Sequence, residues 1–250
     1  MAGSRAKPAR KTARKAGKGN AGPSPRKRLR RLALKGVLGV AGFVVLAVAL
    51  FSVVNPPSTH TIWSEKQRLG HLARTWVDIE AVAPAMARSV VAAEDANFCE
   101  HWGFDMDAIR AAIADGSERG GSTISQQVVK NVYLWQDRSW VRKALEAGLT
   151  PLVEAMWSKR RILEVYLNVA EFDEGVFGID AASWHYFGVA PGDLSARQAA
   201  LLAAVLPSPK TRDAAHPDKA LNRRARAIQD GAATIAADGR AACFETGKAG

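Results

Sequence analysis

The hydrophobic and polar positions divide the chain into a long apolar run and a region of helical periodicity. Residues 36–54 carry no charge and are rich in Val, Leu, Ala and Gly. Between residues 58 and 230, apolar residues recur at helical spacing. This spacing predicts helices over residues 82–98, 124–135, 140–157, 160–170 and 195–206. Alternating, strand-like stretches are nearly absent, residues 60–63 being the only short candidate, so the pattern predicts a mainly α domain.

The apolar run is long enough to cross the hydrocarbon core of a membrane as a helix. Residues 1–35 before it hold thirteen Lys or Arg and no acid, which leaves 22 basic against 24 acidic residues elsewhere. This asymmetry predicts an N-terminus in the cytoplasm, where the basic residues attract anionic lipid head groups. A cleaved signal peptide is the alternative, but no small-x-small cleavage site follows the run. We therefore expect an uncleaved anchor.

Composition completes the expected domain organisation. We expect a basic disordered tail over residues 1–35, a transmembrane helix over residues 36–54, a folded domain over residues 58–230 and a fraying C-terminal tail over residues 231–250.

Three single residues carry further expectations. Sequence does not show whether Cys99 and Cys243 lie within bonding distance, and we expect two free thiols. Pro151 lies inside a predicted helix and should kink or break it.

Candidate chemistry begins with the motif E-D-x-x-F-x-x-H-x-G over residues 94–103. On a helix, Glu94 continues an apolar face beside a second acid, Asp95, so the pKa of its carboxyl should be raised. Such a carboxyl suits general acid or base catalysis near neutral pH. The alternative is an ion pair of either acid with Arg88 at a helix end. His101 fits a helix-end hydrogen bond as well as a place in the site.

A second motif, G-G-S-T-I-S-Q-Q-x-x-K-N, covers residues 120–131. Thr123 and Gln126 have the spacing of a capping box at a helix start. Free amides there, with hydroxyls and a lysine one turn on, predict an anion site that fits pyrophosphate. The alternative is a well-capped helix without chemistry. The candidate ligands are Ser122, Thr123, Gln126, Gln127, Lys130 and Asn131.

Two basic elements follow. Arg142, Lys143 and Glu146 form R-K-x-x-E, which alone indicates no more than an exposed helical salt bridge. Residues 159–168 read K-R-x-I-L-E-x-Y-L-N, a core-packing pattern whose basic pair is available for phosphate. The glycines of residues 175–188 predict turns.

In this order the motifs resemble the signature of the peptidoglycan glycosyltransferases, most closely the monofunctional biosynthetic transglycosylases. The resemblance covers about residues 60–225. It implies a mainly α, lysozyme-like, bilobed glycosyltransferase domain behind a single N-terminal transmembrane helix. Residues 104–119 would map to the smaller jaw lobe, and no transpeptidase module would follow.

The resemblance also implies a reaction, the polymerisation of lipid II into glycan strands. Glu94 would be the general base for the acceptor 4-hydroxyl, with Glu146 as the second catalytic carboxylate. His101 and the candidate ligands of the second motif would bind pyrophosphate and sugar, together with Arg142 and Lys143. Undecaprenyl pyrophosphate would leave, and a β-1,4 bond would form by inversion.

No cofactor is required, and a divalent cation (Mg²⁺ or Mn²⁺) is an option, although the sequence holds no metal-binding motif. The implied partners are lipid II, the nascent strand, membrane lipids and other cell-wall synthesis or division proteins, and not nucleic acid. The implied location is the bacterial inner membrane, single-pass, with the catalytic domain in the periplasm.

Two other functions compete with this one. A membrane-anchored, lysozyme-like muramidase or lytic transglycosylase also needs a carboxylic acid, but it has no use for an anion site with three cations. A non-catalytic cell-wall scaffold has no reason to retain both Glu94 and Glu146. We therefore favour the polymerase.

Overall fold

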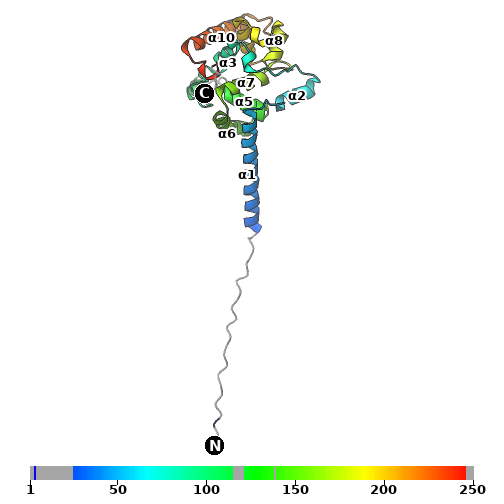
Figure 1. Cartoon of the computed structure of the whole chain (residues 1–250), viewed down its shortest axis with the longest axis vertical. Coiled ribbons are helices and arrows are strands. Elements are labelled where there is room, and N and C mark those ends of the chain that lie inside the picture. The colour runs from blue at the N-terminus through cyan, green and yellow to red at the C-terminus, as the bar shows by residue number, and fades with distance from the viewer. Residues whose placement is uncertain (1–2, 4–24, 115–120, 138, 246–250) are drawn as a thin grey trace. The chain divides into compact units, whose positions relative to one another are not determined.

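The computed structural model describes residue 3 and residues 25–114, 121–137 and 139–245 (Figure 1). The chain falls into two compact units, Met1–Val44 and Val45–Gly250. Each unit is described by itself.

A long helix, α1 (Pro25–Phe51), begins in the basic segment and continues through the apolar run. The predicted disorder is therefore wrong for residues 25–35, because Pro25 suits the first helical position and the Arg, Lys and Leu residues after it favour helix. Residues 4–24 lie outside the described residues. The most apolar window of α1 has a mean hydropathy of 2.3 and is 6% buried. Among the described residues, α1 alone is long and apolar enough to cross a membrane, which fits a single-pass anchor.

The second unit is almost entirely helical, which confirms the predicted fold class. After α1 come α2 (His60–Leu69), η1 (Ile79–Ala81), α3 (Pro84–Glu94), α4 (Met106–Ala114), α5 (Ile124–Tyr133), α6 (Trp140–Met156), α7 (Lys159–Val169), β1 (Glu171–Asp173), β2 (Val176–Phe177), α8 (Ile179–Phe187), η2 (Pro191–Asp193), α9 (Ala196–Val205), α10 (Lys219–Asp238) and α11 (Ala242–Glu245). The strands β1 and β2 pair antiparallel, and the predicted turn is confirmed at Gly175, which has a φ of 74°.

The five helices predicted from periodicity correspond to α3, α5, α6, α7 and α9. The strand candidate at residues 60–63 is wrong, because these residues form the first turn of α2. The Thr59 hydroxyl accepts a hydrogen bond from the amide of Ile62 at 3.2 Å and so caps this helix. Helices α8 and α10 lie outside the five predicted segments.

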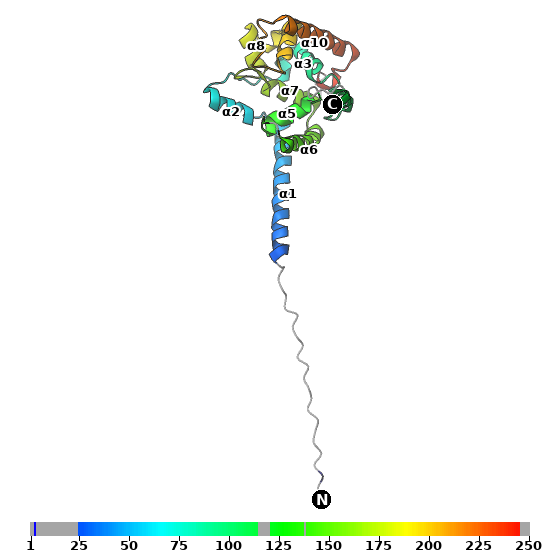
Figure 2. The same cartoon turned by 180° about the vertical axis from the view of Figure 1, so that it is seen from behind.

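Close packing of small residues brings the ends of the central helices together. Helix α3 packs against α9 and α10, while α5 packs against α6 and α7. In both views α3, α7 and α5 follow one another between α10 and α6 (Figures 1 and 2). A Cβ on Gly231 of α10 would lie only 3.2 Å from the Cβ of Ala92 in α3. This close approach lets α10 pack tightly against the C-terminal part of α3.

Helix α6 runs through Pro151 without a break, so of the predicted kink or break the break does not occur. The proline removes one backbone donor, but burial of Val153 and Glu154 beyond it holds the last turn against the domain. The Thr150 hydroxyl also donates to the carbonyl of Glu146 at 2.7 Å. Packing outweighs the local cost of the proline here.

The C-terminal segment is packed rather than frayed, and the tail predicted from residue 231 is wrong up to residue 245. Helix α10 continues to Asp238, where Gly239, with a φ of 81°, turns the chain back. Ile235 and Phe244 are each 1% exposed. The Phe244 ring lies 6.4 Å from that of Phe98, centroid to centroid, so the last helix closes the core of the domain.

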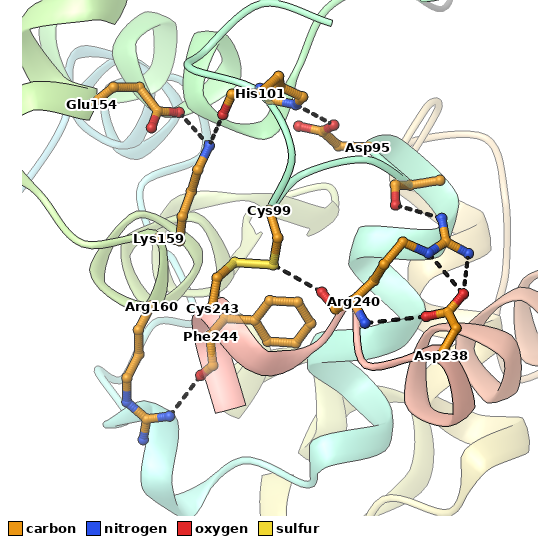
Figure 3. The surroundings of a disulfide bond; sticks show 11 residues. Asp95, Cys99, His101, Glu154, Lys159, Arg160, Asp238, Arg240, Cys243 and Phe244 are labelled. Carbon is orange, nitrogen blue, oxygen red and sulfur yellow. Dashed lines mark hydrogen bonds and ion pairs between the residues drawn. A yellow bond between two sulfur atoms is a disulfide. The ribbon is translucent and has the colours of Figure 1, made fainter. Parts of the chain in front are cut away.

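A disulfide joins Cys99 to Cys243, and the prediction of two free thiols is wrong (Figure 3). The two residues are 144 positions apart, so only the return of the chain after Gly239 brings them together. The bridge ties the loop after α3 to α11 beside α7, where Arg160 donates to the carbonyl of Phe244 at 2.7 Å. The loop that carries the first motif is thereby anchored to the end of the chain.

We expect the double variant Cys99→Ala/Cys243→Ala to lose roughly 2–4 kcal/mol of unfolding free energy, because the bridge closes a long loop. The measurement is denaturant unfolding of the full chain in detergent, with and without reductant. Reductant should bring the wild type to the stability of the variant and leave the variant unchanged. A wild type whose stability ignores reductant would argue against the bridge.

Candidate active site

Glu94, the last residue of α3, carries the most perturbed carboxyl of the first motif. It follows the apolar face of Met86 and Val90, both of which are fully buried. Burial raises the pKa of Glu94, as the sequence predicted, and is the largest influence on it. The neighbouring acid, Asp95, raises the pKa too but has the smallest effect. Desolvation, rather than carboxylate repulsion, therefore sets the protonation of this group.

Three groups contact or face the Glu94 carboxyl and oppose its protonation. Gln127 Nε2 donates to Glu94 Oε2 at 2.9 Å, and Arg224 Nη2 lies 3.9 Å from Glu94 Oε1. The charges of Arg224 and Lys130 favour the carboxylate. Gln127 is itself held by the hydroxyl of Tyr166, which donates to Gln127 Oε1 at 3.4 Å. The carboxyl thus has a fixed orientation and a partly compensated charge.

Asp95 has a different role, since its side chain is only 1% exposed and both oxygens are engaged. Asp95 Oδ2 accepts from the amide of Ile124 at 2.9 Å, and Oδ1 accepts from His101 Nε2 at 2.7 Å. Figure 3 shows the contact of His101 with Asp95. His101 Nδ1 accepts from the amide of Gly103 at 3.1 Å, which leaves the proton on Nε2. Both ring nitrogens of His101 therefore form hydrogen bonds within the protein, as the helix-end alternative predicted.

The capping box at the start of α5 is confirmed. The Thr123 amide donates to Gln126 Oε1 at 3.1 Å, and the Gln126 amide donates to Thr123 Oγ1 at 3.3 Å. The Thr123 hydroxyl also donates to the carbonyl of Gly103 at 2.7 Å. Since Asp95 takes the amide of Ile124, the amides of residues 123, 124 and 126 are all occupied. These three amides are therefore not free for an anion, and Thr123 and Gln126 are buried capping residues.

The third motif forms a charge cluster around the buried Glu146 of α6. Arg142 Nη1 lies 2.7 Å from Glu146 Oε2, and Lys143 Nζ lies 2.5 Å from Glu146 Oε1. The Glu146 side chain is 4% exposed, so the pair is not the exposed salt bridge of the alternative reading. Burial lowers the pKa of the nearby Lys130, and the charge of Glu146 opposes that effect. Lys143 also donates to Ser122 Oγ at 3.4 Å, which brings the second motif into the cluster.

The basic pair of the fourth motif is not available for phosphate, contrary to the prediction. Lys159 donates to Glu154 Oε1 and to the carbonyl of His101, both at 2.8 Å (Figure 3). Arg160 pairs with Glu80 on the opposite side of α7 from this contact. Both cations are therefore committed to structural pairs.

Glu94 and Gln127 each line a different cavity. One, of about 250 Å³, is lined by Glu94, Asp95 and Ser122 among others. The other, of about 380 Å³, is lined by Gln127, Lys130 and Asn131, and extends to Glu171 and Lys210. Burial raises the pKa of Glu171 as well. The carboxyl of Glu94 and its hydrogen-bond partner thus face two separate spaces.

The sequence reading missed three charged residues of this region: Arg224, Glu171 and Lys210. Arg224 is one of several arginines on α10, and only the packing of α10 on α3 distinguishes it. Its Nε is buried without a hydrogen-bond partner in the described part of the chain. No spacing in the sequence could have indicated these residues.

The desolvated carboxyl of Glu94 lines one cavity, and Lys130 lines the cavity beside its partner Gln127, an arrangement that suits acid–base chemistry on an anionic substrate. Comparison with known proteins narrows the class. Residues 62–232 match the family model described as "Transglycosylase". A "Biosynthetic peptidoglycan transglycosylase" of Jannaschia sp. (strain CCS1) is 60% identical over 216 residues, which cover 86% of this chain and 90% of that protein.

Two further proteins of the same description agree. That of Cronobacter sakazakii (strain ATCC BAA-894) is 49% identical over 76% of this chain and 83% of its own length. That of Pseudomonas fluorescens (strain Pf0-1) is 46% identical over 82% of this chain and 89% of its own. The chain therefore belongs to the transglycosylase family. It is a peptidoglycan glycosyltransferase of cell-wall biosynthesis, and its matched domain is the transglycosylase domain alone.

The structural role of Lys159 gives a prediction. We expect Lys159→Met to lose roughly 3–5 kcal/mol of unfolding free energy, because it leaves the buried Glu154 without its cation. The double variant Glu154→Met/Lys159→Met should recover most of the loss, since an apolar pair leaves no buried charge. Denaturant unfolding of the full chain measures both. If the single variant is as stable as the wild type, Lys159 has no structural role and remains available for phosphate, as the sequence predicted.

Proposed function

We propose that Glu94 is the general base of lipid II polymerisation. It takes the proton of the 4-hydroxyl of an acceptor lipid II, and the oxygen attacks the anomeric carbon of the growing chain. The bond to undecaprenyl pyrophosphate breaks, and the α-linked donor becomes a β-1,4-linked product by inversion. The observation that carries this proposal is a desolvated carboxyl of raised pKa that lines one cavity and is hydrogen-bonded to Gln127, which lines another.

The leaving pyrophosphate gains negative charge as the bond breaks, and fixed cations can stabilise it. Lys130, Arg142 and Lys143 are the groups placed for this role. Glu146 orients Arg142 and Lys143 through its two oxygens, rather than moving a proton itself. Ser122, Gln127 and Asn131 remain as polar contacts for the substrate on the two cavity walls.

The residues present do not favour a divalent cation at this site. The carboxylate best placed to bind one is Glu146, and both of its oxygens are ion-paired. Among the described residues, no group of three or more His, Cys, Asp and Glu side chains gathers around one point. We therefore derive no step through a metal.

We also propose that the enzyme lies in the bacterial inner membrane with its N-terminus in the cytoplasm and its catalytic domain in the periplasm. Five basic residues in the first two turns of α1 support this orientation: Arg26, Lys27, Arg28, Arg30 and Arg31. The disulfide Cys99–Cys243 supports it independently, because disulfides persist in the periplasm and are rare in the cytosol. Lipid II, the nascent strand and membrane lipids would then be its partners, with other cell-wall proteins beside them.

The test is polymerisation of purified lipid II by the full chain. We expect Glu94→Gln to lower the rate by about 10²–10⁴-fold, because it replaces the base by an amide of nearly the same size and shape. The control is Glu174→Gln, which changes an exposed carboxylate and should leave the rate unchanged. Near-normal polymerisation by Glu94→Gln would end the assignment, and shortening of preformed strands by the wild type would favour a muramidase.

A second expectation concerns pH. Glu94 acts as a carboxylate, so activity is present above its pKa and is lost as the pH falls through it. The charge of Arg224 lowers that pKa against the effect of burial. In Arg224→Met the acid limb of the pH–rate profile should therefore move to higher pH. Arg223→Met changes an exposed residue of the same helix and should leave the acid limb in place. If the acid limb does not move in Arg224→Met either, Arg224 does not influence the pKa of the catalytic group.

A further inference from the structure

The last two turns of α1 belong to the enzyme's own compact unit and are held by side chains of Trp157, which follows α6, and of Arg161 in α7. Trp157 Nε1 donates to the carbonyl of Val48 at 2.8 Å. Arg161 donates from Nε to the carbonyl of Phe51 at 3.1 Å and from Nη2 to that of Val54 at 2.9 Å. The Val48 carbonyl also accepts the helical amide of Ser52 at 3.2 Å, so Trp157 adds a second donor to it. Arg161 binds carbonyls at and just beyond the end of α1, where a cation complements the helix dipole. We call Trp157 and Arg161 the anchor clasp.

Arg161 is itself fixed more firmly than a surface arginine. Its side chain is 11% exposed, it pairs with Glu164, and it also donates to Asn55 Oδ1 at 2.8 Å. Its guanidinium lies 5.5 Å from the ring centroid of Trp76 and 5.9 Å from that of Trp157. The planar fork of arginine suits several fixed acceptors at once, which a lysine could not match.

The segment that leaves α1 is held in the same way. Arg74 Nη1 donates to the carbonyl of Pro57 at 2.7 Å, and Nη2 donates to that of Pro56 at 2.9 Å. A flexible linker would leave these carbonyls to water. The path from the apolar helix into the domain is therefore rigidly bonded over residues 48–57.

The helix that carries Arg161 also reaches the catalytic carboxyl. Five residues further along α7, the buried Tyr166 donates to Gln127, which donates to Glu94. The end of the anchor and the base are thus connected through one helix and two side chains. Helix α7 is eleven residues long and almost wholly buried after its first turn, so it can transmit position without bending.

We propose that the anchor clasp is a positioning site that holds the base at a fixed height above the membrane. This inference rests on the proposed function. The pyrophosphate of a lipid-linked substrate stays at the membrane surface. The reacting anomeric carbon of the donor is bonded directly to an oxygen of that pyrophosphate. A base that shifts along the membrane normal would leave the attacking geometry, where small displacements are costly. Arg161 and Trp157 touch no substrate in this scheme and act through Val48, Phe51 and Val54.

The test compares two substrates on one preparation, the full chain reconstituted in phospholipid vesicles. One substrate is lipid II with its natural undecaprenyl chain, embedded in the vesicle. The other is a water-soluble lipid II analogue with a short chain. We expect Arg161→Met to lower kcat on the embedded substrate by about ten- to a hundredfold and to change kcat on the soluble one by no more than about twofold. Arg161→Lys should recover part of the loss, because one donor group remains.

Arg160→Met is the matched control, since Arg160 is the adjacent residue and bonds to Glu80 and Phe244 rather than to α1. It should leave the ratio of the two rates unchanged. Trp157→Phe removes the donor to Val48 but keeps an aromatic ring, and it covers the case in which Arg161→Met does not fold. It should lower the embedded rate alone, by a smaller factor.

Equal losses on both substrates in folded Arg161→Met and Trp157→Phe would reduce the clasp to a stabilising contact and overturn the proposal. Unchanged rates on both substrates would overturn it as well. The assignment of Glu94 as the base is tested separately. Normal polymerisation by Glu94→Gln would disprove that assignment, whatever the ratio of the two rates in the clasp variants.

Discussion

The site depends on one buried carboxylate that joins two helices. Asp95 accepts the amide of Ile124 and the Nε2 proton of His101, so the end of α3 is bonded to the start of α5. Because Glu94 precedes Asp95, this junction decides where Glu94 points. It brings Glu94 to Gln127, one turn into α5, and so into the field of Lys130. A protein without Asp95 would have the same base and cations but no fixed relation between them.

The distribution of charge separates structural from reactive groups. Inside the domain, Glu154 is paired with Lys159 and Glu164 with Arg161, and each pair is buried and well bonded. Glu94 differs, since its partners are an amide and an arginine at 3.9 Å, and burial shifts its pKa upward. A carboxyl that is desolvated but incompletely compensated can exchange a proton near neutral pH. Glu94 therefore differs from the structural carboxylates in lacking a close ion-pair partner for its buried charge.

The predicted motifs lie together in the structure, but several of their residues make other contacts than the sequence predicted. The motif over residues 120–131 does begin a helix, and its capping box is present. The amides expected to bind pyrophosphate are occupied, however, and Lys159 serves Glu154 rather than an anion. Spacing along a helix predicts which side chains share a face, but not what an element distant in sequence brings to that face. Asp95 reaches Ile124 across 29 positions, and no local pattern reports such a contact.

By itself the sequence determined the apolar helix, the mainly α domain, the five helices of strongest periodicity and the position of Glu94 on an apolar face. These follow from local spacing and composition, which act over one or two helical turns. Only the tertiary structure decided that Cys99 meets Cys243, that Arg224 faces Glu94 and that Arg161 holds the end of α1. Each of these contacts joins segments 100 or more residues apart, and chain packing alone brings such segments together.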